Sequence, residues 1–230
     1  MHQTVLNTAA APARRQRRGR FNNAPQNSYI WHAVEYGPAT LDRTQVFTLN
    51  YVYTIPVFKD GHGALAYALK GWQVTGITTY YTGSPFTVTT SGADPAGLGL
   101  LSTSSVASSR PDMVCNPSAS APHTIAQWFP TSCFPAVAQG QVRPGNAGRG
   151  VIRGPRFGNW DASLMKNFKM GEHFNLQLRG ESFNLPNHPN PSGFGGGSGA
   201  NSINNTSSLF GQITTFRAPR RIQIGAKLTF

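Results

Sequence analysis

Residues 221–230 read RIQIGAKLTF, and this stretch decides the fold. Every second position carries an apolar side chain, and the positions between them are polar apart from Gly225. Alternation with a period of two is typical of a β-strand with one apolar face. The apolar positions are Ile222, Ile224, Ala226, Leu228 and Phe230.

Similar alternation recurs along the chain between stretches rich in turn-forming residues, which predicts an all-β protein. At 160–168 the pattern blurs at Met165 and Lys166, and at 72–81 its phase is ambiguous because Thr and Tyr suit either face. With the terminal stretch there are about six predicted antiparallel strands. The other five are 29–36, 46–53, 72–81, 160–168 and 174–185.

The connections between these strands alternate in length. The turn at 170–173 is tight, and 57–71 is moderate, with a short helix predicted at 64–69. In contrast, 83–159 and 186–220 are long and rich in Gly, Pro, Ser and Asn. Long loops count against a compact soluble sandwich. They fit a transmembrane β-barrel, which has short periplasmic turns and long outer loops.

The length of the strands fits the same architecture. A tilted strand crosses a bilayer in roughly 9–11 residues. Because lipid offers no hydrogen bonds, such strands must close into a barrel, with the apolar face toward lipid and the polar face toward a watery lumen. The alternative is a soluble antiparallel sheet with one wet face. A helical membrane protein is excluded, since no apolar run approaches the roughly 18 residues that a spanning helix needs.

The chain carries a net charge of +12, which raises the question of an acidic partner. Five of its basic residues are arginines within 14–20, and residues 1–20 contain no acid. We predict a disordered basic leader over 1–27, with contact to nucleic acid or anionic lipid as the alternative. No apolar segment follows these arginines, so the leader is not a secretory signal peptide.

Two cysteines, Cys115 and Cys133, lie in the first long loop. No CxxC pair accompanies them, which disfavours a zinc site. We predict a disulfide that pins this loop in an oxidising compartment, with two unpaired thiols as the alternative.

Several stretches together resemble the Oar-like group of TonB-dependent outer-membrane receptors. They are LDRTQVFTLNYVYTIP at 41–56, GWQVTGITTYYTGSPFTV at 71–88, RPD at 110–112, GNAGRGVIRGPRFGNWDASLMKNF at 145–168, FNLQLRGESFNLPNHPNP at 174–191 and FGQITTFRAPRRIQIGAKLTF at 210–230.

The resemblance implies that residues 28–230 form the C-terminal portion of a 22-stranded barrel in the cell outer membrane. It also implies that the alternating end, closed by Phe230, is the signal read by the barrel-assembly machinery. Since six strands are too few for such a barrel, we expect one part of a larger receptor, inactive alone. TonB would act through a plug outside this chain, on an unknown solute.

Four arginines give the first long loop a basic character that suits an anionic ligand or lipopolysaccharide headgroups. The alternative is that they pair with carboxylates of a plug or of loops that are not present in this chain. These residues are Arg143, Arg149, Arg153 and Arg156.

No segment predicts catalysis. The run GFGGGSG at 193–199 lacks the Lys-Ser or Lys-Thr of a phosphate loop. His188 has no partner at ligand spacing, and charges such as Arg179 and Glu181 are expected on a wet strand face. We therefore expect no enzyme, metal or cofactor.

The function expected is part of a solute transporter. An adhesion or structural barrel without transport is the runner-up, and a basic nucleic-acid-binding protein is the third hypothesis.

Overall fold

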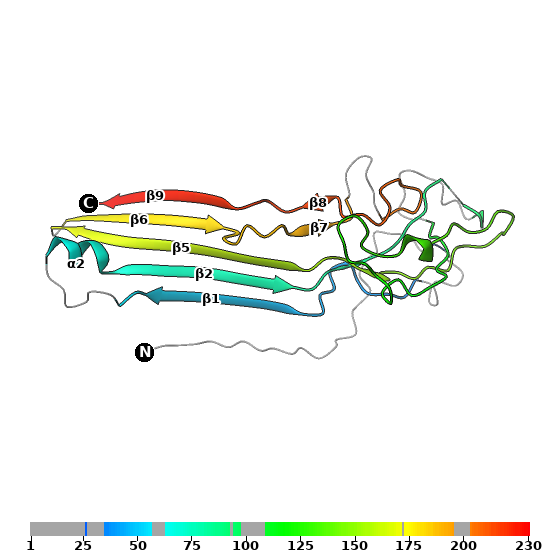
Figure 1. Cartoon of the computed structure of the whole chain (residues 1–230), viewed down its shortest axis with the longest axis horizontal. Coiled ribbons are helices and arrows are strands. Elements are labelled where there is room, and N and C mark those ends of the chain that lie inside the picture. The colour runs from blue at the N-terminus through cyan, green and yellow to red at the C-terminus, as the bar shows by residue number, and fades with distance from the viewer. Residues whose placement is uncertain are drawn as a thin grey trace.

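The computed structural model describes residues 26, 35–56, 63–92, 94–97, 109–171, 173–195 and 203–230. Its main element is a five-stranded antiparallel sheet in the order β1-β2-β5-β6-β9, which is open at both edges (Figure 1). The strands are β1 (Val46–Thr54), β2 (Trp72–Tyr81), β5 (Phe157–Met170), β6 (Phe174–Phe183) and β9 (Arg221–Thr229).

Five of the six predicted strands are therefore confirmed, with small differences at their ends. β5 is longer than predicted at both ends, and β6 stops two residues earlier. It stops because Asn184 adopts a left-handed φ of 55° and donates its backbone N–H to Asp161 Oδ1 at 2.8 Å. Residues 29–34 of the sixth predicted strand lie outside the described residues, and Glu35 and Tyr36 are not in a strand.

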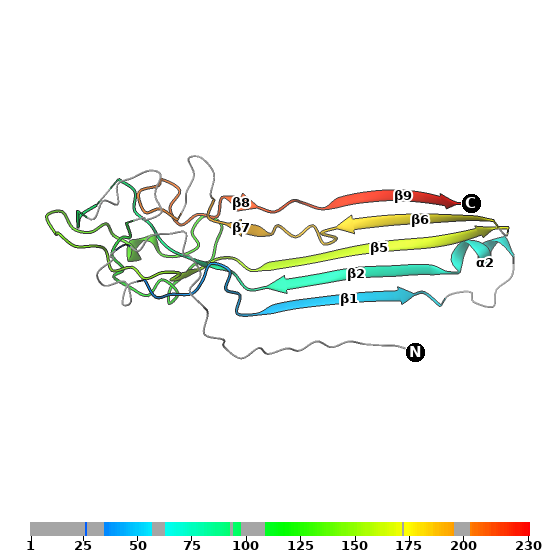
Figure 2. The ribbon, with the colours of Figure 1, turned by 180° about the vertical axis from the view of Figure 1, so that it is seen from behind.

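The short and long connections lie at opposite ends of the sheet, as predicted (Figures 1 and 2). The predicted helix is present as α2 (Ala64–Leu69), between β1 and β2. The tight turn between β5 and β6 lies at the same end, where Gly171 takes a positive φ of 73° that glycine adopts without strain. The C-terminus is also here, and both long loops lie at the far end.

The strand register sorts the side chains onto two faces, because residues directly opposite in an antiparallel pair share a face. One face is apolar and continues across all five strands through pairs such as Leu49–Thr78, Leu164–Gly180 and Gly180–Ile224. The other face carries the polar partners, such as the Glu181–Gln223 pair.

The two long outer loops fold together into a cap, defined here as the described residues of 82–156 and 184–220. It contains the short strands β3 (Pro85–Phe86), β4 (Ile152–Arg153), β7 (Pro191–Gly193) and β8 (Thr215–Phe216), and the 3-10 helix η1 (Thr131–Cys133).

Although the two loops are rich in Gly, Pro, Ser and Asn, they also contain buried apolar residues. Every member of the buried apolar core that the structure describes lies in the cap: Val88, Phe129, Cys133, Phe134, Ala147, Ile152, Phe194, Ile203 and Ile213.

Phe129 is at the centre of this core. Its ring makes edge contacts with Phe134 of the same loop, and with Phe194 and Phe210 of the second loop, at centroid distances of 5.6, 5.6 and 5.3 Å. Such aromatic pairs add about 0.5–1.5 kcal/mol each beyond their burial. The two loops therefore form one packed unit.

Within the described part of the chain, no helix has the length and apolar character needed to cross a membrane.

Candidate functional site

The apolar face is exposed along the C-terminal strand. Ile222 is 69% exposed, Ile224 86% and Leu228 51%, and Phe230, which follows the strand, is 90% exposed. Ala226 on the same face is exposed as well. An exposed apolar surface of this extent on a folded sheet indicates contact with something other than water.

One glycine on the apolar face marks a close contact between strands. Gly76 of β2 lies opposite Tyr51 of β1, and a Cβ at Gly76 would lie 2.2 Å from the Tyr51 hydroxyl oxygen. That hydroxyl accepts a hydrogen bond of 2.5 Å from the indole N–H of Trp160. Gly76 is thus required for the tyrosine to lie across the strand and meet Trp160.

Lys166 is the exception on the apolar face, and it explains the blurred pattern in the sequence. It lies opposite Leu178 and Trp72, and only 2% of its side chain is exposed. Its ammonium donates to the carbonyl oxygens of Tyr67, at 2.6 Å, and Ala68 in helix α2. The strand thus continues in phase through Met165 and Lys166.

The polar face carries the remaining charged residues of the five strands. Its basic residues are Lys169, Arg179, Arg221 and Lys227, and its acidic residues are Asp161 and Glu181. Arg179 pairs with Glu181 at 3.4 Å. Asp161 accepts hydrogen bonds from Asn159 Nδ2 and the Asn184 backbone, both at 2.8 Å. This face therefore has a surplus of positive charge.

A cluster that the sequence did not predict lies at the cap end of the polar face. We call it the mouth cluster: Arg43, Tyr81, Phe157 and Arg217. Tyr81 and Phe157 are stacked at 4.6 Å and 20°. The Arg43 guanidinium lies 5.3 Å from the Tyr81 ring centre, and that of Arg217 lies 4.6 Å from the Phe157 ring centre. Arg217 also donates to the Tyr81 hydroxyl at 2.8 Å.

No sequence signal identifies the mouth cluster, because its residues come from four separate segments. The register places Tyr81 opposite Phe157 at the ends of β2 and β5, and Arg217 follows β8.

Three of the four arginines predicted as anion contacts are already paired with carboxylates of this chain. Arg143 pairs with Asp112 and Arg153 with Asp42, each at 2.6 Å, and Arg149 pairs with Glu35. Arg156 is exposed and forms no ion pair with the residues that the structure describes. The partners expected from a plug or other loops are thus partly supplied within the chain.

Glu35 lies in a largely buried network with two arginines. Its Oε1 accepts a hydrogen bond from Arg110 at 2.8 Å, and its Oε2 accepts one from Arg149. The Arg110 Nε also donates to Gln26 Oε1 at 2.6 Å. Burial lowers the pKa of Arg110 although Glu35 opposes this effect. The network fixes Gln26 and Glu35, which precede β1, to the cap.

Asp112 and Arg143 form an ion pair within the cap. Two hydrogen bonds of 2.7 and 2.6 Å join the guanidinium to the two carboxylate oxygens. The hydrogen bonds from Arg143 lower the pKa of Asp112, and those to Asp112 raise the pKa of Arg143.

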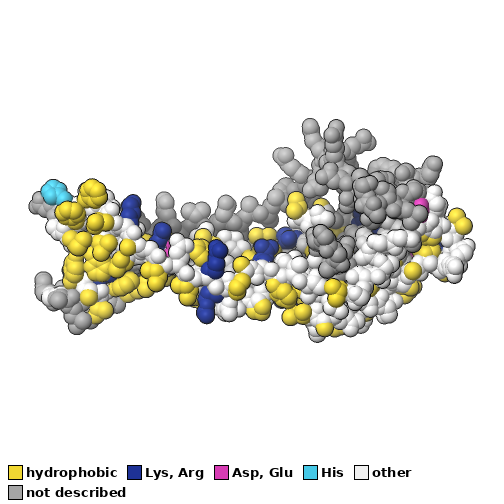
Figure 3. Space-filling model, turned by 90° about the horizontal axis from the view of Figure 1, so that it is seen from above, with side chains coloured by type: hydrophobic (Ala, Val, Ile, Leu, Met, Phe, Trp, Pro, Cys, Tyr) yellow, Lys and Arg dark blue, Asp and Glu magenta, His cyan; other side chains and the backbone are white. Residues whose placement is uncertain are grey.

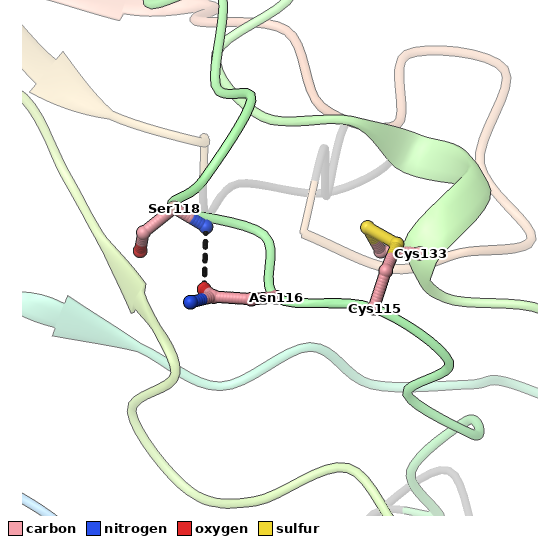
Figure 4. Close-up of a disulfide and its surroundings, with 4 residues drawn as sticks. All are labelled: Cys115, Asn116, Ser118 and Cys133. Atoms are coloured by element: carbon pink, nitrogen blue, oxygen red, sulfur yellow. Dashed lines mark hydrogen bonds between the residues drawn. A yellow bond between two sulfur atoms is a disulfide. The ribbon is translucent and has the colours of Figure 1, made fainter.

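Cys115 and Cys133 are joined by a disulfide, with their Cα atoms 5.0 Å apart (Figure 4). Next to it, the side-chain oxygen of Asn116 accepts a hydrogen bond of 3.0 Å from the backbone N–H of Ser118. The disulfide links the segment after Arg110 to helix η1 and the Phe129 core.

The remaining sequence candidates form no catalytic constellation that the structure describes. His188 contacts Asn184 and Asn190, and residues 196–199 of the glycine-rich run lie outside the described residues. Among the described residues, no group of three or more His, Cys, Asp or Glu side chains is arranged to hold a metal ion.

Comparison with known proteins identifies a family. The model of a family described as "outer membrane beta barrel domain" matches residues 6–223 of this chain. No curated protein and no solved structure matches the chain.

Proposed function

Because the chain belongs to the outer membrane beta barrel domain family, we propose that it forms wall strands and outer loops of a TonB-dependent receptor that takes up a solute. The family places the protein in the outer membrane of a Gram-negative bacterium. The proposal assigns it a role in transport and none in catalysis.

The observation that carries the proposal is the separation of charge between the two faces. Among the residues of the five-stranded sheet, every charged side chain except Lys166 lies on the polar face. Barrel walls that enclose water carry polar side chains inward and apolar ones toward lipid. A wet inner wall is what a solute route needs.

The described strands are too few to enclose a lumen by themselves. Membrane barrels of this kind have at least about eight strands. In a five-stranded antiparallel sheet, the edge strands β1 and β9 run in the same direction, so joining copies edge to edge would create parallel pairs. We propose that the remaining strands, and the plug on which TonB acts, belong to another part of the receptor, without which this part is inactive.

A second function, a surface or adhesion barrel without transport, is favoured by the cap. It has its own packed core and a disulfide, so it presents a rigid surface at the outer end of the sheet. The nucleic-acid hypothesis rests on the arginines at 14–20, which lie outside the described residues.

The test begins with expression of the complete gene in a Gram-negative host and separation of its membranes. Protein extracted from the outer membrane with detergent is passed over an immobilised periplasmic domain of TonB, with a variant lacking the TonB box as the control. If the native protein is retained on the TonB domain and the control variant is not, the result supports the TonB-dependent receptor.

Outer-membrane protein that is not retained, from a gene with no plug-encoding segment upstream of Met1, overturns transport in favour of the adhesion barrel. Recovery in the soluble cytoplasm with bound DNA, released by salt, overturns both barrel functions.

A further inference from the structure

The mouth cluster leaves two guanidiniums available to a ligand. The guanidinium carbon of each arginine lies over an aromatic ring, and in the described part of the chain most of its N–H donors form no hydrogen bond. One nitrogen of Arg217 donates a hydrogen bond to the Tyr81 hydroxyl, and one nitrogen of Arg43 donates to the Asp42 carbonyl oxygen at 3.2 Å. In-plane donors of this kind bind carboxylate or phosphate in pairs.

Neither guanidinium is neutralised by a carboxylate of the described residues. Asp42 is next to Arg43 in the sequence, but its carboxylate is paired with Arg153 at 2.6 Å. Arg217 has only the Tyr81 hydroxyl and the Phe157 ring as side-chain partners in the described part of the chain. The mouth cluster therefore carries uncompensated positive charge on partly exposed side chains.

Below the mouth cluster, the basic residues of the polar face follow the strands toward the opposite end. We call Arg221, Arg179, Lys227 and Lys169 the basic ladder. The register orders them in this sequence from the cap end toward the C-terminus, since Arg221 lies opposite Phe183, Lys227 opposite Gln177 and Lys169 opposite Asn175. Successive same-face positions on a strand are about 7 Å apart. Figure 3, seen from the β9 side, shows basic side chains strung along the strands.

The positive charge of the basic ladder exceeds the negative charge on the same face. Its four cations face two carboxylates, of which Glu181 is paired with Arg179 and Asp161 is occupied by two amides. Inside a barrel, low-dielectric walls concentrate the field of such charges and raise the local concentration of the opposite ion. Rings or rows of Arg and Lys are the means by which pores favour anions and phosphates.

We propose that the mouth cluster binds the oxyanion group of a solute, a carboxylate or a phosphate, and that the basic ladder favours entry of anionic solutes into the lumen. This inference rests on the proposed transport function and names its substrate class. Arg43 and Arg217 hold the oxyanion, and the Tyr81–Phe157 stack sets the spacing of the two guanidiniums.

The test uses the intact protein, purified from outer membranes in detergent. Binding of citrate, inorganic phosphate, glucose and free lysine is measured by isothermal titration calorimetry. We expect citrate or phosphate to bind and the neutral and cationic probes not to bind, and the stronger of the two anions identifies the group recognised. Arg217→Gln and Arg43→Gln are each expected to weaken anion binding roughly tenfold, the effect of losing a charge-assisted hydrogen bond.

Lys70→Gln is the matched control, because it removes the same charge from an exposed residue at the opposite end of the sheet. We expect it to leave anion binding within about twofold, whereas Arg217→Lys should keep part of the binding, since an ammonium retains the charge but not the paired donors. Equal losses in all variants, or no anion binding by the native protein, overturn the mouth cluster as an oxyanion site. The native protein would bind no anion if the two arginines were already paired with acidic side chains of a plug.

The transport function is measured separately, as uptake of radiolabelled citrate or phosphate by cells with and without a protonophore. Anion binding without energy-dependent uptake overturns the transporter and leaves the oxyanion site. Energy-dependent uptake of a neutral or cationic solute, with no anion binding, supports the transporter and overturns the oxyanion site.

Discussion

The ammonium of Lys166 donates a hydrogen bond of 2.6 Å to the carbonyl oxygen of Tyr67, from the apolar face of the sheet to helix α2. It also lies 4.5 Å from the centre of the Phe168 ring and 5.5 Å from that of Trp72. A buried lysine is tolerated here because helix carbonyls and aromatic faces replace water around its charge. The short helix and β5 are thereby held together.

Lys166→Met is expected to loosen helix α2, because it removes two hydrogen bonds to the end of the helix while keeping an apolar side chain on the lipid face. Hydrogen bonds to a charged group contribute roughly 1.5–3 kcal/mol, so the opening free energy of the Tyr67 amide should fall by about that amount. Hydrogen exchange of the detergent-solubilised protein measures it. Lys70→Met, at an exposed position, is the control, and equal protection in both variants would show that Lys166 does not hold the helix.

Lys166 also illustrates what the sequence predicted well and what it did not. Segments such as 174–183 and 221–229 have a strand period that local alternation reveals, because the two faces meet different environments. Lys166 places a charge on the apolar face and so breaks this alternation. Its charge is accommodated there by carbonyl oxygens about a hundred residues earlier in the chain. Local alternation contains no information on such a partner.

The cap shows a different limit of sequence reasoning. Phe129, Phe194 and Ile213 are spread over two loops rich in Gly, Pro, Ser and Asn, with no period that marks them as a core. They come together only because the strands bring the two long loops to the same end of the sheet. For the same reason Arg43 and Arg217 of the mouth cluster could not be connected from the sequence, whereas Arg143 and Arg149 stood out by proximity alone.

Phe129→Ala is expected to destabilise both outer loops at once, because its ring contacts Phe134 in one loop and Phe194 in the other. Truncation of a buried phenylalanine costs about 3–5 kcal/mol. Hydrogen exchange should rise together in the segments around Phe134 and Ile213. Ile125→Ala, at a residue that is 56% exposed, should change little. Loosening confined to the first loop would contradict a shared core.

Acid is expected to weaken the cap through Asp112. Arg143 lowers the pKa of Asp112 below the usual 3.8, so the pair contributes stability above that value and loses it as the pH falls through the folded-state pKa. Asp112→Asn should therefore lower the melting temperature of the cap at pH 7. It should also reduce the fall in melting temperature that the native protein shows between pH 7 and pH 3. Near-ultraviolet circular dichroism of the solubilised protein on heating measures both.

Asp42→Asn is the control for this prediction, because the Asp42–Arg153 pair is exposed and such pairs contribute little. If Asp112→Asn kept the full native pH dependence, the Asp112–Arg143 pair would not be the acid-sensitive element of the cap.

The central claim is that the sheet separates lipid from water along its whole length, and β9 tests it most directly. Cysteines are introduced one at a time from Ile222 to Leu228 and spin-labelled in the intact protein, reconstituted in lipid vesicles, and relaxation is measured with oxygen and with a water-soluble nickel chelate. We predict a period of two, with Ile222, Ile224 and Leu228 accessible to oxygen and Gln223 and Lys227 accessible to nickel. Equal access of the nickel chelate to both sets would contradict a membrane wall.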